Sequence, residues 1–596
     1  MFIRKLMSRI TNTSGSENDP VELSPTGPEA SATENTTAET QETAGDPPDR
    51  RQIGAFTTSS GSVPGAGDRL RSDTAEINLY DRLPYPNYSH RESHPRKLEA
   101  IATLFGMKPP PSNACRVLEL GCASGWNLIP QAQDLPFSRF LGIDSSVRQI
   151  ENARNMAEEL DLQNIELRHA DILEVDRDWG QFDYIICHGI YSWVPKEVRE
   201  KLLEICSGNL VSNGVALVSY NTYPGWSTRG MVRDMMRYHV AGREDPHEQV
   251  TQARAVLKFL AENCPEDTPH AKALENELAA LSDKSDSQIF HDHLELVNHP
   301  VYFHQFVEQA GANNLQYLGD VNFHQMVSGF LSKDAKALLA GVPLLQQEQY
   351  MDYLNNRLFR RSLLCHADVK LERNLQPRII YGFHVAQTQP LDLKLLDPNE
   401  EKPVGFKIGK HKLMINGPLV KAAIWRLSEV WPESLLFEDL HTQALDMLQP
   451  GQRELYEESQ KSEAGDSRSE LSLALMAFMS AGLMECFVHP PRPLRRPGEH
   501  PVASPVARCQ ARDGVKVTNS RHELVTLTDT EHHIIKSLDG SHDRQALASS
   551  LGDALASGAM RVMQDGEALD EVDPKMLSDI VERSLHRLYR GALLVE

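Results

Sequence analysis

The sequence predicts an α/β domain built on a mainly parallel sheet, followed by smaller α+β modules. Two observations support this prediction. Short apolar runs alternate with amphipathic stretches between residues 115 and 220, which is the pattern of parallel strands joined by crossover helices. A loose internal repeat then appears between residues 412 and 551, and it predicts two related modules near the C-terminus.

The α/β pattern assigns each segment in order. We expect strands at 115–120, 139–144, 164–170, 182–188 and 214–220, separated by helices starting at 127, 147 and 196. Residues 229–298 read as polar helices, and 302–321 restores a helix followed by a strand. We therefore expect a helical insertion within the α/β domain, with the last strands of the sheet near 315–328. A helical segment should follow.

These elements divide the chain into four expected parts: a disordered tail (1–75), the α/β domain (76–330, with the insertion at about 229–298), a helical middle segment (331–395) and a C-terminal domain (396–596). From about Thr11 to Asp73 this tail is rich in Ser, Thr, Glu, Pro and Gly and has almost no large apolar residues. Such a segment cannot bury enough surface to offset the entropy that ordering would cost.

The repeat in the C-terminal domain aligns two segments of similar order, 412–445 and 523–551. Both run from a strand through a helix and a break into a second helix, as two winged-helix-like modules would. The alternative function for such modules is sequence-specific DNA binding. Their second helices, EDLHTQAL and RQALASSL, carry little basic charge, which argues against it. We favour protein contact as their use.

Composition limits the function classes. The 596 residues include 61 Lys plus Arg and 83 Asp plus Glu, a net charge of −22. We expect no nucleic-acid partner, because phosphate binding needs an excess of basic residues. No apolar run approaches the ~18 residues of a membrane span, and the first ten residues lack the apolar core of a signal peptide. The eight cysteines form no CxxC pair. We expect a cytoplasmic protein.

The segment VLELGCASGWN (117–127) is the most informative motif. A dinucleotide-type GxGxxG register would place Trp126 where a helix must approach the sheet closely. The register that fits is acid-x-Gly-x-Ala-x-Gly, from Glu119 to Gly125, and it resembles the turn of class I S-adenosylmethionine-dependent methyltransferases. Ala123 replaces the middle glycine of that turn and should narrow the approach of the cofactor.

The following strands add polar residues at the same edge of the sheet, where open α/β folds bind ligands. Asp144 ends the second strand, where a carboxylate can accept both ribose hydroxyls, and Asp171 follows the third, where adenine is read. The cofactor is expected to be S-adenosyl-L-methionine. Its expected binding residues are Glu119, Gly121, Cys122, Ala123, Gly125, Asn127, Asp144, Ser145, Asp171, Ile172, Cys187 and His188.

A closer resemblance covers about residues 78 to 545. The segments YDRLPYPNYSHRESHPRKLEAIATLFGM, RVLELGCASGWNLIP, FDYIICHGIYSWVP and SYNTYPGW resemble bacterial methyltransferases that carry a methyltransferase regulatory domain. The best-known members of this family are rickettsial protein-lysine methyltransferases that act on an outer-membrane protein. The resemblance implies a Rossmann-like class I sheet, a regulatory segment at about 270–330 and a protein substrate with accessible lysines. Whether the protein forms a homo-oligomer is left open.

A lysine acceptor must lose its proton, and an aromatic, water-poor slot favours that loss. The expected catalytic residues at the sheet edge are His188, Tyr191, Trp193, Tyr223 and Trp226; the expected substrate-binding residues are Tyr85, Tyr88 and Tyr220. Each has a structural alternative: Tyr220 fits a core position, the tryptophans can pin loops next to prolines, and His188 can be a buried, satisfied histidine.

The segment HDHLELVNHP offers His291, His293, Glu295 and His299 as metal ligands. Methyl transfer to an amine needs no metal, so we expect none and assign this segment to packing over the cleft. Two other functions remain open: methylation of a small molecule, and a regulatory protein that senses the cofactor and binds a partner through its C-terminal modules.

Overall fold

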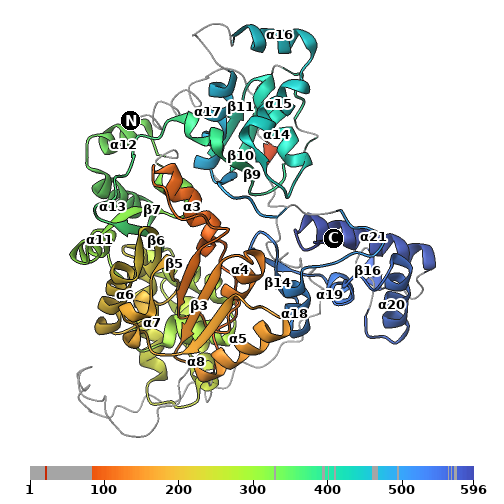
Figure 1. The fold of residues 1–596 in the computed structure, drawn as a ribbon. Coiled ribbons are helices and arrows are strands. Elements are labelled where there is room, and N and C mark those ends of the chain that lie inside the picture. The colour runs from red at the N-terminus through yellow and green to blue at the C-terminus, as the bar shows by residue number, and fades with distance from the viewer. Residues whose placement is uncertain are drawn as a thin grey trace.

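The structure is a computed structural model. It describes Val21–Glu22 and residues 83–595, apart from 328–330, 392, 394–395, 401, 409–410, 460–466, 493–495, 561–562, 565–566 and 569–572. The predicted disordered tail therefore lies outside the described residues, except for β1 (Val21–Glu22), which pairs with β10. The described residues form an α/β domain with two smaller C-terminal modules beside it (Figure 1).

The α/β domain contains a seven-stranded sheet of order β4-β3-β2-β5-β6-β8-β7. Strands β2 to β6 are parallel, and β8 runs antiparallel to both β6 and β7. The strands are β2 (Arg116–Leu120), β3 (Arg139–Asp144), β4 (Ile165–His169), β5 (Phe182–Cys187), β6 (Leu210–Asn221), β7 (Leu315–Asp320) and β8 (Phe359–His366).

Alternation along these strands supplies both faces of the sheet with apolar side chains. Val117 and Tyr184 pack toward α3 (Pro95–Leu104) and α4 (Leu128–Asp134), whereas Leu118 and Ile185 pack toward α6 (Lys196–Gly208) and α11 (Phe303–Ala312). Helix α5 (Val147–Glu159) begins at Ser146, whose side chain caps Gln149 N. The sheet is thus buried on both faces, and its ligand-binding edge is left free.

The prediction of a helical middle segment over 331–395 is wrong in part. Helices α12 (Lys333–Ala340) and α13 (Leu344–Asn355) are present, but β8 then inserts between β6 and β7. Strand β9 (His384–Gln387) also falls in this range and belongs to the first C-terminal module. The sequence does not reveal these strands, because their pairing partners lie far away in the chain.

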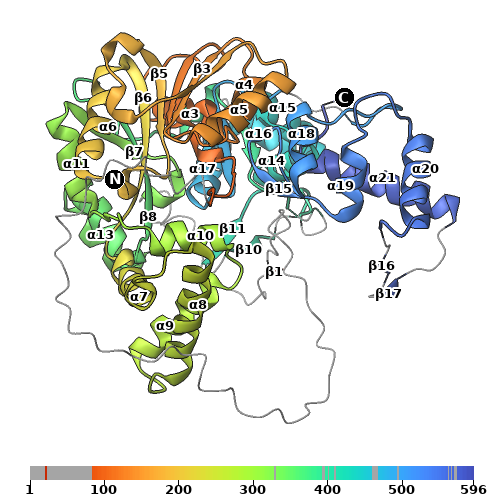
Figure 2. The same ribbon diagram turned by 90° about the horizontal axis from the view of Figure 1, so that it is seen from below.

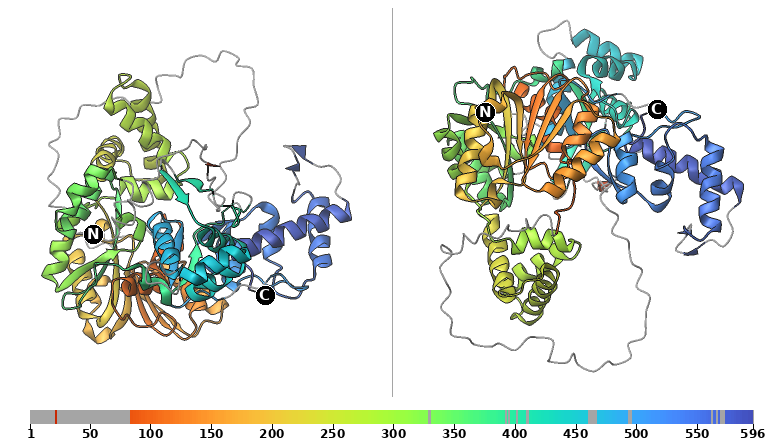
Figure 3. Two further views of the ribbon diagram at one scale, coloured as in Figure 1. Left: turned by 90° about the horizontal axis from the view of Figure 1, so that it is seen from above. Right: turned by 60° about the horizontal axis from the view of Figure 1, so that its bottom comes forward.

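The helices between β6 and α11 form a separate projection on one side of the sheet (Figures 2 and 3). They are α7 (Gly225–Val240), α8 (Pro246–Asn263), α9 (Pro269–Leu281) and α10 (Asp286–Ile289), the last continued by a π-helix (Phe290–Leu294). Helices α8 and α9 each start with a capping residue followed by proline, Asp245-Pro and Thr268-Pro. Val232, Leu257 and Leu274 belong to the buried core of this projection.

The first C-terminal module has the strand order β12-β9-β13, with a β10–β11 hairpin. Its elements are β10 (Val404–Ile408), β11 (His411–Ile415), α14 (Pro418–Glu429), β12 (Leu435–Leu436), α15 (Phe437–Asp446), α16 (Pro450–Ser459), α17 (Ser467–Ser480) and β13 (Met484–Phe487). The second contains α18 (Pro505–Asp513), β14 (Lys516–Thr518), β15 (Leu524–Thr526), α19 (Asp529–Ile535), α20 (Arg544–Ala556), β16 (Met563–Gln564), β17 (Glu567–Ala568) and α21 (Pro574–Arg590).

The repeat read from the sequence corresponds to two strand–helix–helix units, β11–α14–α15 and β15–α19–α20. The matched residues Ile424, Leu427, Ile535 and Leu538 are all fully buried. Glu485 on β13 joins both modules to the α/β domain, because it pairs with Arg91 and with Arg521, the latter at 2.6 Å. These two cations hold the pKa of the buried Glu485 at about 2.

Among the described helices, none is both long and apolar enough to cross a membrane.

Candidate active site

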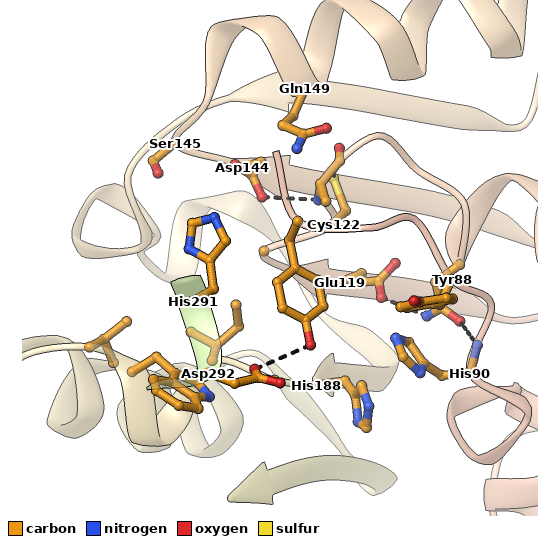
Figure 4. Close-up of a pocket in the computed structure, with 18 of the residues that line it drawn as sticks. Tyr88, His90, Glu119, Cys122, Asp144, Ser145, Gln149, His188, His291 and Asp292 are labelled. Atoms are coloured by element: carbon orange, nitrogen blue, oxygen red, sulfur yellow. Dashed lines mark hydrogen bonds between the residues drawn. The ribbon is translucent and has the colours of Figure 1, made fainter. Parts of the chain in front are cut away.

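A cavity of about 540 Å³ lies at the carboxyl ends of β2, β3 and β5. Its walls also include residues 85–88 and His90, which precede α3, and residues of α7 and the π-helix. Figure 4 shows Glu119, Asp144, His188 and Asp292 around this space. Of the residues predicted from the sequence, those that line it are Tyr85, Tyr88, Glu119, Gly121, Cys122, Ala123, Asn127, Asp144, Ser145, Asp171, Ile172, His188, Trp193 and Trp226.

The turn after β2 requires left-handed backbone at three positions. Gly121 and Gly125 have φ of 75°, and Ala123 has φ of 47°. A Cβ on Gly121 would lie 2.4 Å from Cδ1 of Ile190, so glycine is needed there for both conformation and space. The Ala123 N–H donates to Oδ2 of Asp144 at 2.9 Å, which ties the turn to the end of β3.

Glu119 is buried at the base of this turn. Its Oε1 accepts a 2.6 Å hydrogen bond from Nδ2 of Asn127, whereas Oε2 has no hydrogen-bond partner among the described residues. Burial raises the pKa of Glu119 to about 7, although the hydrogen bond from Asn127 opposes this shift. A buried carboxylate oxygen without a partner is costly. The cavity therefore offers a position where a cationic group would be stabilised.

Asn127 is held by residues from two distant parts of the chain. Its Oδ1 accepts from His90 N at 2.9 Å and from Nε2 of His522, in the second C-terminal module, also at 2.9 Å. The backbone donor fixes which end of the amide is the oxygen, so Nδ2 faces Glu119. Burial keeps the pKa of His522 well below its usual value. A neutral His522 thus donates from Nε2.

The two aspartates expected to bind the nucleoside also line the cavity. Asp144 accepts backbone N–H bonds from Ala123 and from Ser146, both at 2.9 Å. Asp171 is exposed and caps a short 3₁₀-helix by accepting from Leu173 N at 2.8 Å. Each carboxylate has lone pairs beyond those used in these contacts, so both can accept further hydrogen bonds from a ligand.

His188 lies against His90, with ring centroids 4.1 Å apart, and against Phe359 at 5.9 Å. Burial, with a smaller contribution from His90, lowers the pKa of His188 well below its usual value. His188 is therefore neutral near pH 7, and its Nδ1 has no hydrogen-bond partner in the part of the chain that the structure describes. It can accept a hydrogen bond, but it is a weak base.

Three family models match the chain: a methyltransferase domain over 117–214, a predicted methyltransferase regulatory domain over 285–366, and a PKMT C-terminal winged helix domain over 499–593. The solved structure of PKMT2 from Rickettsia typhi is 30% identical, covers 86% of this chain and 100% of that chain, and superimposes with a TM-score of 0.75. The chain belongs to the PKMT family of methyltransferases.

Two further comparisons also cover most of the chain. The uncharacterized Rickettsia prowazekii protein RP789 is 33% identical over 535 residues, 87% of this chain and 94% of RP789. The complex of R. typhi PKMT2 with AdoHcy superimposes with a TM-score of 0.76, at 30% identity over 86% of this chain and 100% of that chain. The predicted fold class is confirmed, including the winged helix at the C-terminus.

Five residues predicted for the PKMT site do not line the cavity. Tyr191 and Tyr220 are buried against Phe306 under the sheet, with Tyr220 stacked on that ring at 4.1 Å. Tyr223 packs on Tyr302 at 5.2 Å. The sheet explains Tyr220: strand alternation turns it into the core, while the next residue, Asn221, faces the cavity.

Cys187 and Gly125 are the other two corrections. Cys187 is fully buried at the end of β5. Gly125 lies behind the turn, where a Cβ would approach Cδ1 of Ile129 to 2.7 Å. Its role is to let the turn pack on α4.

Replacing Tyr191 with Phe should destabilise the PKMT fold without impairing methyl transfer. The Tyr191 hydroxyl donates to Oε1 of Gln309, and loss of one buried hydrogen bond costs about 0.5–1.5 kcal/mol. Chemical denaturation should show this loss in the free energy of unfolding, while turnover at saturating substrate stays within about twofold. A tenfold drop in turnover of a folded Tyr191→Phe protein would contradict the core position.

Several residues that line the cavity were not predicted from the sequence: Trp126, Gln149, Asn221, Arg229, Asp292 and Phe359. Trp126 and Asn221 adjoin motif residues and could have been found from their neighbours. Phe359 begins the strand that the sequence reading missed. Arg229 and Asp292 come from the helical projection. The segment that contains Asp292 was expected to pack over the cleft, but neither residue was predicted as part of the site.

Proposed function

We propose that the protein transfers methyl groups from S-adenosyl-L-methionine to lysine side chains of protein substrates. The observation that supports this most strongly is that a buried carboxylate and a pair of aromatic side chains line the same cavity. The lining includes Glu119, with a buried oxygen that has no hydrogen-bond partner among the described residues, and also the aromatic side chains of Trp193 and Trp226. The first suits the ammonium group of the cofactor, and the second suits an amine acceptor.

The residues present fit the cofactor. Glu119 would hold its ammonium group, Asp144 its ribose hydroxyls and Asp171 with Ile172 its adenine. Gly121 would let the backbone approach the ligand closely, whereas the methyl group of Ala123 would narrow this approach. When bound, S-adenosylmethionine supplies a methyl group on a positively charged sulfur. The protein then has to orient the acceptor amine toward that methyl group and exclude water.

Trp193 and Trp226 form an edge-to-face pair with ring centroids 5.9 Å apart. Aromatic faces attract a lysine ammonium and also accommodate its methylated forms. Tyr85 and Tyr88, from residues preceding α3, line the same space. The aromatic side chains of this slot would partly desolvate a lysine, which favours the neutral, nucleophilic amine.

The C-terminal winged helix contributes to the cofactor site through His522. Replacing His522 with Ala removes one donor to Asn127 and should weaken S-adenosylmethionine binding by about 0.5–1.5 kcal/mol, or about two- to tenfold. Isothermal titration calorimetry measures this change. The matched control is His532→Ala in the same module, because that ring bonds Ala511 O instead of the site. Equal losses in both variants would show that the effect comes from the stability of the module.

Incubation with methyl-labelled S-adenosylmethionine tests the acceptor class. The protein and an Asp144→Ala control are incubated with lysate of the source cells, which is then separated into protein and small-molecule fractions. We expect label in the protein fraction and little label with the control. Label confined to small molecules would assign the site to metabolite methylation. Cofactor binding without any transfer would favour a regulatory role.

A further inference from the structure

We propose that Asp292 is the carboxylate that receives the ammonium group of the acceptor lysine and then takes its proton. This assignment rests on the proposed function and adds a residue to the acceptor side of the site. Asp292 lies in the segment 285–366 that matches the regulatory-domain model. That segment would thus supply a catalytic residue in addition to any regulatory part.

The position of Asp292 is fixed by the π-helix Phe290–Leu294. Neighbouring side chains in this element are held elsewhere: Nε2 of His291 bonds Leu83 O at 2.6 Å, and Nε2 of His293 bonds Oε1 of Glu277 at 3.3 Å. Asp292 lies between these two histidines in the sequence and lines the cavity, and Figure 4 shows it together with His188. π-helical turns are rare and often occur at functional sites.

The contacts of Asp292 leave it suited to a cation. Its Oδ1 accepts a 3.3 Å hydrogen bond from the Tyr85 hydroxyl, which can orient the carboxylate but does not neutralise it. Arg229 also lines the cavity, yet its Nε pairs with Oε1 of Glu277 at 2.7 Å, and its guanidinium lies over the Trp226 ring at 5.6 Å. Burial raises the pKa of Asp292, although His293, Lys284 and Arg229 oppose this shift. An arriving ammonium would further stabilise the charged form.

Proton transfer from lysine to this carboxylate balances the reaction. The acceptor arrives as an ammonium, one N–H bond breaks and the proton passes to an Asp292 oxygen. The freed lone pair then forms the N–C bond as the C–S bond of the sulfonium breaks, leaving a neutral thioether and a methylated ammonium. The tryptophan pair that lines the same cavity can hold the alkyl chain of the lysine during these steps.

The decisive experiment compares Asp292→Asn, Asp292→Glu and Asp286→Asn. Asp286→Asn is the matched control, because it makes the same charge change in the adjoining α10. The Oδ1 atom of Asp286 pairs with a guanidinium nitrogen of Arg254 at 3.4 Å on the outer side. Three quantities are measured for each variant: label transfer to lysate protein, S-adenosylmethionine affinity, and binding of n-butylamine to the AdoHcy complex by saturation-transfer NMR. The uncharged n-butanol serves as the reference probe.

We expect Asp292→Asn to lower label transfer at least tenfold and to weaken n-butylamine binding, with cofactor affinity within about twofold of the unmodified protein. Asp292→Glu should recover part of the transfer, and Asp286→Asn should behave like the parent. Unchanged transfer and amine binding in Asp292→Asn would overturn the assignment, as would an equal loss of cofactor affinity. If the parent protein itself labels no protein, the proposed function fails instead.

Discussion

Glu119→Gln should weaken S-adenosylmethionine binding by about 1.5–3 kcal/mol, which corresponds to about 10- to 150-fold in Kd. The substitution keeps the size of the side chain and the oxygen that accepts from Asn127. It removes the negative charge that would meet the ammonium group of the cofactor. Calorimetric titration of both proteins measures the change, and unaltered affinity would show that the ammonium is held elsewhere.

The raised pKa of Glu119 provides a second test of its role in cofactor binding. Because burial places this pKa at about 7 in the free protein, the carboxyl group is largely protonated below pH 6 and ionised above pH 8. Only the ionised form attracts the cofactor ammonium, so affinity should rise as the pH increases from about 5.5 to 7.5. Glu119→Gln should lose this rise. An identical pH dependence in both proteins would contradict the assignment.

Asp144→Ala should also weaken cofactor binding by about 1.5–3 kcal/mol, since it deletes a charged acceptor expected for the ribose hydroxyls. The same change removes the acceptor for the Ala123 and Ser146 N–H groups. Asp144→Asn is therefore the matched variant, because it retains one acceptor oxygen while losing the charge. We expect an intermediate Kd for Asp144→Asn and a lower melting temperature for Asp144→Ala. Normal cofactor affinity in both variants would exclude Asp144 from the ribose site.

The sequence predicts the five parallel strands of the sheet well, because β2 to β6 follow each other as local apolar runs with short connections. It fails at β8, whose partner strands β6 and β7 are separated from it by the helical projection and by α12 and α13. The motif on the β2–α4 turn also locates the cavity, since a glycine turn and Asp144 require little beyond their own strands.

The acceptor side of the site is harder to predict from sequence. Tyr191 and Tyr220 occur beside motif residues, yet the direction of each side chain depends on which face of the sheet it joins. Contacts between distant segments are not visible in the sequence at all: His522 meets Asn127 across 395 positions, and Asp292 meets Tyr85 across 207. Residue type and proximity in sequence therefore predicted cavity-lining residues better for the expected cofactor positions than for the expected acceptor positions.

The most direct test of the proposed function is to locate the transferred methyl group. Protein labelled in the lysate reaction is digested, and the modified residues are identified by mass spectrometry. We predict methylation on lysine Nζ, absent from the reaction with Glu119→Gln at low cofactor concentration. Methyl groups found on carboxylates, arginine or histidine, with lysine unmodified, would contradict the proposed function.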